Sequence, residues 1–175
     1  MATDGVAPVI TVRRVDYRDP GDAEALVTLL DLYAREPIGG GAPLDDSVRR
    51  TLPARLAAFP GACSLLAIAD GEAAGLANAV FGFSTFAVRP LLNLHDLVVA
   101  PAWRGHGVGR HLLAALETLA REEDCCKLTL EVLGGNDVAQ RLYRGCGFAP
   151  YSLDPQHGPA QFWHKPLASE SEEPR

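Results

Sequence analysis

Residues 94–113 read LHDLVVAPAWRGHGVGRHLL, and this stretch decides the fold prediction. An apolar run ends at Pro101, glycines alternate at Gly105, Gly107 and Gly109, and a leucine-rich segment follows. This order is typical of a strand, a tight glycine turn and the start of a helix. The first N–H groups of a helix lack internal partners and carry a partial positive charge, so the turn is suited to binding an anion.

Two well-known phosphate-binding loops do not fit this turn. A P-loop needs Lys followed by Ser or Thr, and both are missing here. The Rossmann pattern G-x-G-x-x-G is broken at Arg110 in one frame and at Leu112 in the other. Arg104 and Arg110 flank the turn and add cationic groups. A turn that merely tolerates glycine is the alternative, but three glycines at a spacing of two between arginines favour a phosphate site.

Hydrophobic periodicity predicts the elements on both sides of this turn. Before it we expect strands at 9–15, 63–70, 73–86 and 91–99, and helices at 22–36 and 45–59, the second interrupted or kinked at Pro53. After it we expect a helix at 108–122, a strand at 127–133, a helix at 136–148 and a last strand at 160–167. Early strands can pair as hairpins and later ones are separated by helices. The sequence therefore predicts a mixed α/β sheet with helices on both faces.

The composition is that of one domain, expected to span residues 1–167, followed by a disordered tail at 168–175. No apolar run approaches the roughly 20 residues that span a bilayer, and no secretory signal pattern opens the chain, so we expect a cytoplasmic protein without membrane partners. The net charge of −6 argues against nucleic acid as a partner. It is compatible with a cationic substrate, and equally with ordinary solubility. The four cysteines lack metal-ligand spacing, so reduced thiols and no metal site are expected.

The stretch VVAPAWRGHGVGRHLL resembles the acetyl-CoA-binding motif of the GNAT N-acetyltransferases, whose core is [QR]-x-x-G-x-[GA]. Residues 104–109, RGHGVG, match that core. The resemblance continues through KLTLEVLGGNDVAQRLYRGCGF at 127–148 and covers about residues 9–167. It implies a mostly antiparallel central sheet in which two strands splay apart beside the cofactor, acetyl-CoA. It also implies an acetyltransferase.

The resemblance implies which residues hold the cofactor. Backbone N–H groups of the glycine turn match those that bind the pyrophosphate, and the preceding strand carries a bulge and pairs with the pantetheine arm through its backbone. Two further residues, at the start of the next predicted helix, match family residues that contact the pantetheine arm. These cofactor residues are Leu97, Val98, Val99, Arg104, Gly105, His106, Gly107, Val108, Gly109, Arg110, Asn136 and Ala139. Asn136 is equally expected to cap its helix.

Two residues are expected to carry the proton transfers. Tyr143 lies seven residues after Asn136, hence on nearly the same helix face, and matches the family tyrosine that protonates the leaving thiolate. His95 stands where diamine acetyltransferase-like members carry a glutamate, and is expected to act as the base or else merely to line the site. Asp96 faces the other side of a regular strand, although a bulge would change that.

The acceptor site is the least defined part. A weaker resemblance to diamine acetyltransferases suggests that Phe83, Ser84, Thr85 and Phe86 line it, with the loop 36–43 as its rim. The expected reaction is direct acetyl transfer from acetyl-CoA to the primary amine of a small molecule in a ternary complex. A non-catalytic acyl-CoA sensor and a protein or peptide N-acetyltransferase are the alternatives. Analogy with the family suggests a homodimer.

Overall fold

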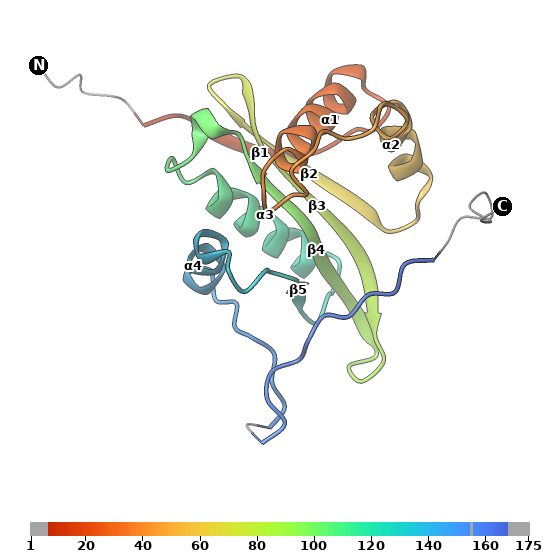
Figure 1. Cartoon of the computed structure of the whole chain (residues 1–175), viewed down its shortest axis with the longest axis vertical. Coiled ribbons are helices and arrows are strands. Elements are labelled where there is room, and N and C mark those ends of the chain that lie inside the picture. Colours follow the sequence, from red (N-terminus) through yellow and green to blue (C-terminus); the bar gives the residue numbers. More distant parts are fainter. Residues whose placement is uncertain (1–6, 155, 168–175) are drawn as a thin grey trace, which may run out of the picture.

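The computed structural model describes residues 7–154 and 156–167, so the tail predicted at 168–175 lies outside the described residues. Within them, five strands and four α-helices form one mixed sheet with helices on its two faces (Figure 1). The elements in chain order are β1 (Ile10–Arg14), α1 (Pro20–Ala34), α2 (Asp46–Ala58), β2 (Ala62–Ala69), β3 (Glu72–Ser84), β4 (Arg89–Val99), α3 (Val108–Glu122), β5 (Leu128–Leu130) and α4 (Asp137–Gly145). None of these helices is long and apolar enough to cross a membrane.

The sheet has the order β1-β2-β3-β4-β5. The first four strands are antiparallel, and β5 joins β4 in parallel. Two apolar cores cover the two faces. Leu112 and Leu116 of α3 pack on one face, and Leu26 and Leu29 of α1 pack on the other. The predicted mixed sheet, mostly antiparallel and covered on both faces, is confirmed.

The end of β4 is the part of the sheet that matters most for function. β4 pairs with β5 only at Leu92–Leu94, yet β4 continues to Val99. The two strands therefore part after Leu94, which is the predicted splay. At the same point β4 bulges, because Leu94 lies opposite Ala79 and Asp96 opposite Asn78, so that His95 has no partner on β3.

Three predicted elements differ from the structure. The last strand, predicted at 160–167, is absent, and Phe162 and Trp163 stay exposed. These adjacent aromatic residues point to opposite sides of an extended chain and cannot share one buried face, while Pro166 has no N–H for pairing. The helix predicted at 45–59 continues through Pro53 without a break. The strand predicted at 127–133 is reduced to Leu128–Leu130 because its partner strand diverges.

Candidate functional site

The glycine turn between β4 and α3 depends on backbone conformations that favour glycine. Gly105 has φ +81° and Gly107 has φ +86°, where Gly107 is the N-cap of α3. A Cβ at Gly105 would meet no atom within 4 Å. Positive φ, rather than crowding, therefore explains glycine at this position. The ring of His106 stands edge-on to Trp103 and contacts the Arg104 carbonyl through Nδ1, at 3.0 Å, which braces the turn.

The turn presents unpaired donors at the start of α3. Among the described residues, the N–H groups of residues 105–109 form no hydrogen bond, whereas the Arg110 N–H donates to the Gly107 carbonyl at 2.9 Å. These donors lie at the positive end of a 15-residue helix. The arrangement is one that can bind a phosphate or diphosphate.

Gly109 has a different role from the other two glycines. A Cβ there would come within 2.9 Å of Leu142 Cδ2 and 3.8 Å of Val99 Cγ2. Its missing side chain lets α4 approach the first turn of α3. The third glycine of the motif thus serves packing, and it holds the helix that carries Tyr143 beside the turn.

The two arginines beside the turn have protein partners. Arg104 forms an ion pair with Glu36, just after α1, and donates from Nε to the Val99 carbonyl at 3.2 Å. Arg110 donates to the Gly145 carbonyl at the end of α4, at 3.4 Å. Arg104 therefore ties the turn to α1 and the end of β4, and Arg110 ties it to α4. Their predicted contacts with the cofactor remain predictions.

The predicted backbone positions for pantetheine lie on the part of β4 that has left β5. Leu97 and Val99 turn their side chains into the core beneath α3, and Val98 turns into the core beneath α1. Backbone groups alternate between the two edges of a strand: the Val98 carbonyl faces Gly75 of β3, so Leu97 and Val99 point their N–H and C=O groups to the other edge. Among the described residues, no strand pairs with that edge from His95 onward. An extended arm can pair with such an edge as an added strand would.

The helix α4 begins at a well-defined cap. The Asn136 side chain accepts a hydrogen bond from the Ala139 N–H at 3.1 Å, so the predicted capping role is confirmed. Tyr143 is half-buried and stands edge-on to Phe148, with ring centroids 5.9 Å apart. Burial raises the pKa of Tyr143 to about 12, and the neighbouring Tyr33 adds to the rise. The phenol is therefore protonated at neutral pH, as an acid must be.

The bulge in β4 changes which side chains share a face. Asp96 lies on the α1 face with Val98, instead of on the α3 face with Leu94, as regular alternation would have placed it. Burial raises the pKa of Tyr33, and the carboxylates of Asp96 and Glu36 raise it further. Asp96 therefore lies close enough to Tyr33 for its charge to act on the phenol, and sequence reasoning assigned neither residue to the site. The possible bulge was the sequence signal that could have placed Asp96 in the site. Tyr33 gives no such signal, because a tyrosine on the apolar face of a helix is ordinary.

His95, the predicted base, is exposed at the bulge, and among the described residues it has no hydrogen-bond partner. The four predicted acceptor residues Phe83, Ser84, Thr85 and Phe86 lie at the tip of the β3–β4 hairpin. Ser84 is six residues from Asn78, which is roughly 20 Å along a strand. The structure does not bring these four residues to the bulge. The resemblance in sequence pointed to this hairpin, but it did not show that the tip of the hairpin lies away from the bulge.

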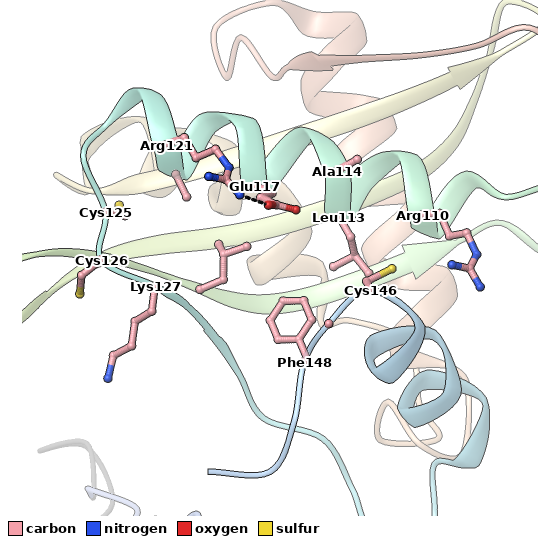
Figure 2. Close-up of a pocket in the computed structure, with 13 residues that line it drawn as sticks. Arg110, Leu113, Ala114, Glu117, Arg121, Cys125, Cys126, Lys127, Cys146 and Phe148 are labelled. Carbon is pink, nitrogen blue, oxygen red and sulfur yellow. Dashed lines mark hydrogen bonds and ion pairs between the residues drawn. The ribbon is translucent and has the colours of Figure 1, made fainter.

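A cavity of about 580 Å³ lies along one flank of α3, between this helix and the segments that follow it in the chain (Figure 2). It is lined by α3, by the chain leading into β5 and by the residues after α4, and Figure 2 shows Arg110 and Cys126 at its opposite ends. Arg110 is the one predicted site residue in its lining. This cavity is therefore not the predicted cofactor site, which is an open strand edge and a turn.

Comparison with known proteins agrees with this geometry. Residues 26–148 match the acetyltransferase (GNAT) family. The chain is 32% identical over 149 residues to an aminoglycoside N(6')-acetyltransferase type 1 of Stenotrophomonas maltophilia. This alignment covers 82% of this chain and 88% of that protein. It is 41% identical over 86 residues to a streptothricin acetyltransferase of Streptomyces lavendulae, covering 49% of this chain and 43% of that protein.

Solved structures share the fold. A probable acetyltransferase has a TM-score of 0.71 at 24% identity, over 93% of this chain and 99% of that one. An aminoglycoside N-acetyltransferase in complex with CoA has a TM-score of 0.67 at 20% identity, over 94% and 99% of the two chains.

The residues of this chain are suited to binding CoA, the cofactor of this family. Unpaired N–H donors at Gly105 and Gly107 suit a diphosphate, and the free edge of β4 suits an amide-bearing arm. The diverging strands and the glycine turn both lie within the matched region. The chain belongs to the GNAT acetyltransferase family and is an acetyl-CoA-dependent N-acetyltransferase.

Proposed function

We propose that this enzyme acetylates a primary amine of a small, polyamino molecule by direct attack in a ternary complex. The single observation that carries the proposal is the location of Asp96 beside the bulge where β4 leaves β5, with a charge that acts on Tyr33 of α1, which in turn acts on Tyr143 of α4. The names of the relatives support the acceptor class, since they act on aminoglycosides and streptothricin. Carboxylates near the site suit an acceptor that arrives as a cation.

Acetyl-CoA, when bound, supplies the acetyl thioester. The backbone donors of residues 105–109 hold the diphosphate, and the free edge of β4 orients the arm and donates an N–H to the thioester carbonyl. The acceptor nitrogen first gives up a proton to His95, directly or through water. Its lone pair then forms the new C–N bond while the C–S bond breaks.

Tyr143 completes the proposed reaction. Its protonated phenol donates to the departing sulfur, and the second proton that the attacking nitrogen sheds on becoming an amide returns to the phenolate. The products are therefore an amide and the free thiol, with the first proton held by His95 until it passes to solvent. A non-catalytic sensor needs no such acid, so the buried Tyr143 favours an enzyme. A peptide acceptor is the second candidate within the enzyme class, and it would need a longer open surface than a single ammonium requires.

The test is a screen of acceptors with acetyl-CoA and a thiol-release readout. The panel holds aminoglycosides, streptothricin, polyamines, free amino acids and short peptides. We expect release of CoA with one of the polyamino small molecules and with none of the peptides. Turnover of peptides alone would replace the small-molecule proposal, and tight binding of CoA without turnover of any amine would favour the sensor.

A further inference from the structure

A row of polar side chains crosses the sheet on the α1 face. Ser64 of β2, Asn78 of β3 and Asp96 of β4 are direct cross-strand partners. Ser64 Oγ donates to Asn78 Oδ1 at 2.6 Å, and Asn78 Nδ2 donates to Asp96 Oδ2 at 3.0 Å. Tyr17, in the loop before α1, extends the row by a 2.9 Å contact between its hydroxyl and Ser64 Oγ. We call these four side chains the polar row.

The middle of the polar row, Ser64 and Asn78, is buried where leucines would otherwise be expected. Ser64 is 2% exposed and Asn78 is 8% exposed. The next cross-strand row on the same face is Leu66, Leu76 and Val98, entirely apolar. Burying amide and hydroxyl groups brings little net stability even when each is paired. Stability alone therefore gives no reason for polar residues in this row.

The hydrogen bonds of the row have one direction. An ionised Asp96 can only accept, so Asn78 must turn its NH₂ toward it and its carbonyl toward Ser64. Ser64 must then donate to that carbonyl, and it accepts from Tyr17. Burial raises the pKa of the Tyr17 phenol, which keeps this first donor protonated. Every donor points toward Asp96, so the row stabilises a negative charge at its end.

Asp96 ends the row at the candidate site. The bulge at His95 places the Asp96 side chain on the α1 face, where its charge acts on Tyr33 of α1. Asp96 is half-buried, and its Oδ2 is taken by Asn78. Among the described residues, no donor bonds to its Oδ1. One oxygen of a positioned carboxylate is thus available at the point where the acceptor must enter.

We propose that Asp96 binds and orients the ammonium group of the acceptor, and that Tyr17, Ser64 and Asn78 act as positioning residues that hold its carboxylate in place. This inference rests on the proposed function and names a specificity-determining residue for it. The ammonium donates to Oδ1 while Asn78 occupies Oδ2. The acceptor nitrogen is thereby held beside the free edge of β4 before it loses its proton.

The main test is Asp96→Asn in the full chain. An asparagine carbonyl at position 96 still accepts from Asn78, so the row and the fold stay intact, but the charge is lost. We expect kcat/KM for the amine found in the screen to fall about 10- to 100-fold, mainly through KM, with the KM for acetyl-CoA unchanged. Asp96→Glu, which keeps the charge, should recover part of the loss.

The positioning residues are tested with a matched pair of asparagines. Asn78→Ala should lower kcat/KM for the amine about tenfold without changing the KM for acetyl-CoA. The control is Asn93→Ala on β4, because Asn93, like Asn78, bonds to a hydroxyl and a carboxylate of neighbouring residues: its Nδ2 donates to Thr129 Oγ1 at 3.0 Å and to Glu131 Oε1 at 3.2 Å. It should change the amine kcat/KM less than twofold. A merely structural row would lower the thermal midpoint and leave the amine KM alone.

The outcomes separate the inference from the proposed function. An active wild type with Asp96→Asn and Asn78→Ala within twofold of it would overturn the inference and leave the proposed function standing. A wild type that binds CoA and acetylates no amine would remove both. Where Asn78→Ala lowers the yield of folded protein, Asp96→Asn decides the question by itself.

Discussion

At the scale of the residue, Tyr143 combines a protonated phenol with a location next to the glycine turn. Its pKa of about 12 is set mainly by burial and lies above the ordinary 10.0. Leu142, the preceding residue, packs against Gly109 and so holds this part of α4 against α3. The acid role depends on that placement, because an exposed tyrosine on the same helix would meet water instead of the departing sulfur.

Tyr143→Phe should lower kcat by about a hundredfold or more while the Kd for CoA stays nearly constant. The phenol hydroxyl has no hydrogen-bond partner among the described residues, so its loss should not unfold the protein. Steady-state kinetics and CoA titration measure the two effects. The control is Tyr151→Phe, an exposed tyrosine after α4, which should retain full activity. Undiminished turnover in Tyr143→Phe would remove the proposed acid.

The pKa of Tyr143 also predicts the pH profile. Because the folded-state pKa is raised, the proton is fully held below pH 10 and is lost only as the pH rises toward 12. The kcat of the wild type should therefore show no descending limb from this tyrosine between pH 7 and about 10. A descending limb near pH 9 that disappears in Tyr143→Phe would contradict the raised pKa, although it would still identify Tyr143 as the acid.

At the scale of the element, the contact between α3 and the sheet decides where the glycine turn lies. Gly75 of β3 sits under the first turn of α3, where a Cβ would come within 2.8 Å of both Val98 O and Val108 Cγ1. A backbone atom cannot move aside as a flexible side chain can. The start of α3, and with it the row of N–H donors, rests directly on this strand.

Gly75→Ala should lower the free energy of unfolding by about 1–3 kcal/mol, because the added methyl group overpacks this contact. Urea denaturation measures the change. Gly134→Ala is the matched control, since a Cβ there meets nothing within 4 Å, and it should stay within about 0.5 kcal/mol of the wild type. Equal stability of the two variants would show that α3 does not rest on Gly75 as described.

The elements differ in how well local pattern predicts them. The helix predicted at 108–122 has those bounds in the structure, because its apolar stripe and the glycine before it are both local signals. The prediction of a strand at 160–167 was wrong. A strand needs another strand to pair with, and the pattern of its own residues does not show whether such a partner is present. The same limit explains β5, whose length depends on where β4 turns away.

At the scale of the whole molecule, the predicted cofactor residues lie on a continuous stretch, β4, the glycine turn and α3, and on α4, which the fold packs against α3. The glycine turn should grip the diphosphate, and the edge of β4 should hold the arm. CoA at a hundred times its Kd should therefore stabilise the protein by about 2.7 kcal/mol, raising the thermal midpoint by roughly 5–10 °C. Thermal unfolding with and without ligand measures this shift.

Pantetheine is the control for the role of the turn, since it keeps the arm and lacks the diphosphate. At the same concentration it should raise the midpoint much less than CoA does. An equal shift from both ligands would mean that the N–H groups of residues 105–109 do not bind the diphosphate, even though CoA binds.

Sequence alone was enough to predict the class of fold, the glycine turn and both ends of α3. It was also enough to predict the cap at Asn136 and the spacing that puts Tyr143 on the same helix face, because each of these features depends on residues close together in the chain. Only the tertiary structure decided that β4 leaves β5 after Leu94 and that a bulge at His95 turns Asp96 to the α1 face. It also decided that the hairpin tip at 83–86 lies away from the site. The physical reason is that the register between strands follows from packing on both faces of the sheet, and shifting it by one residue exchanges the side chains of the two faces.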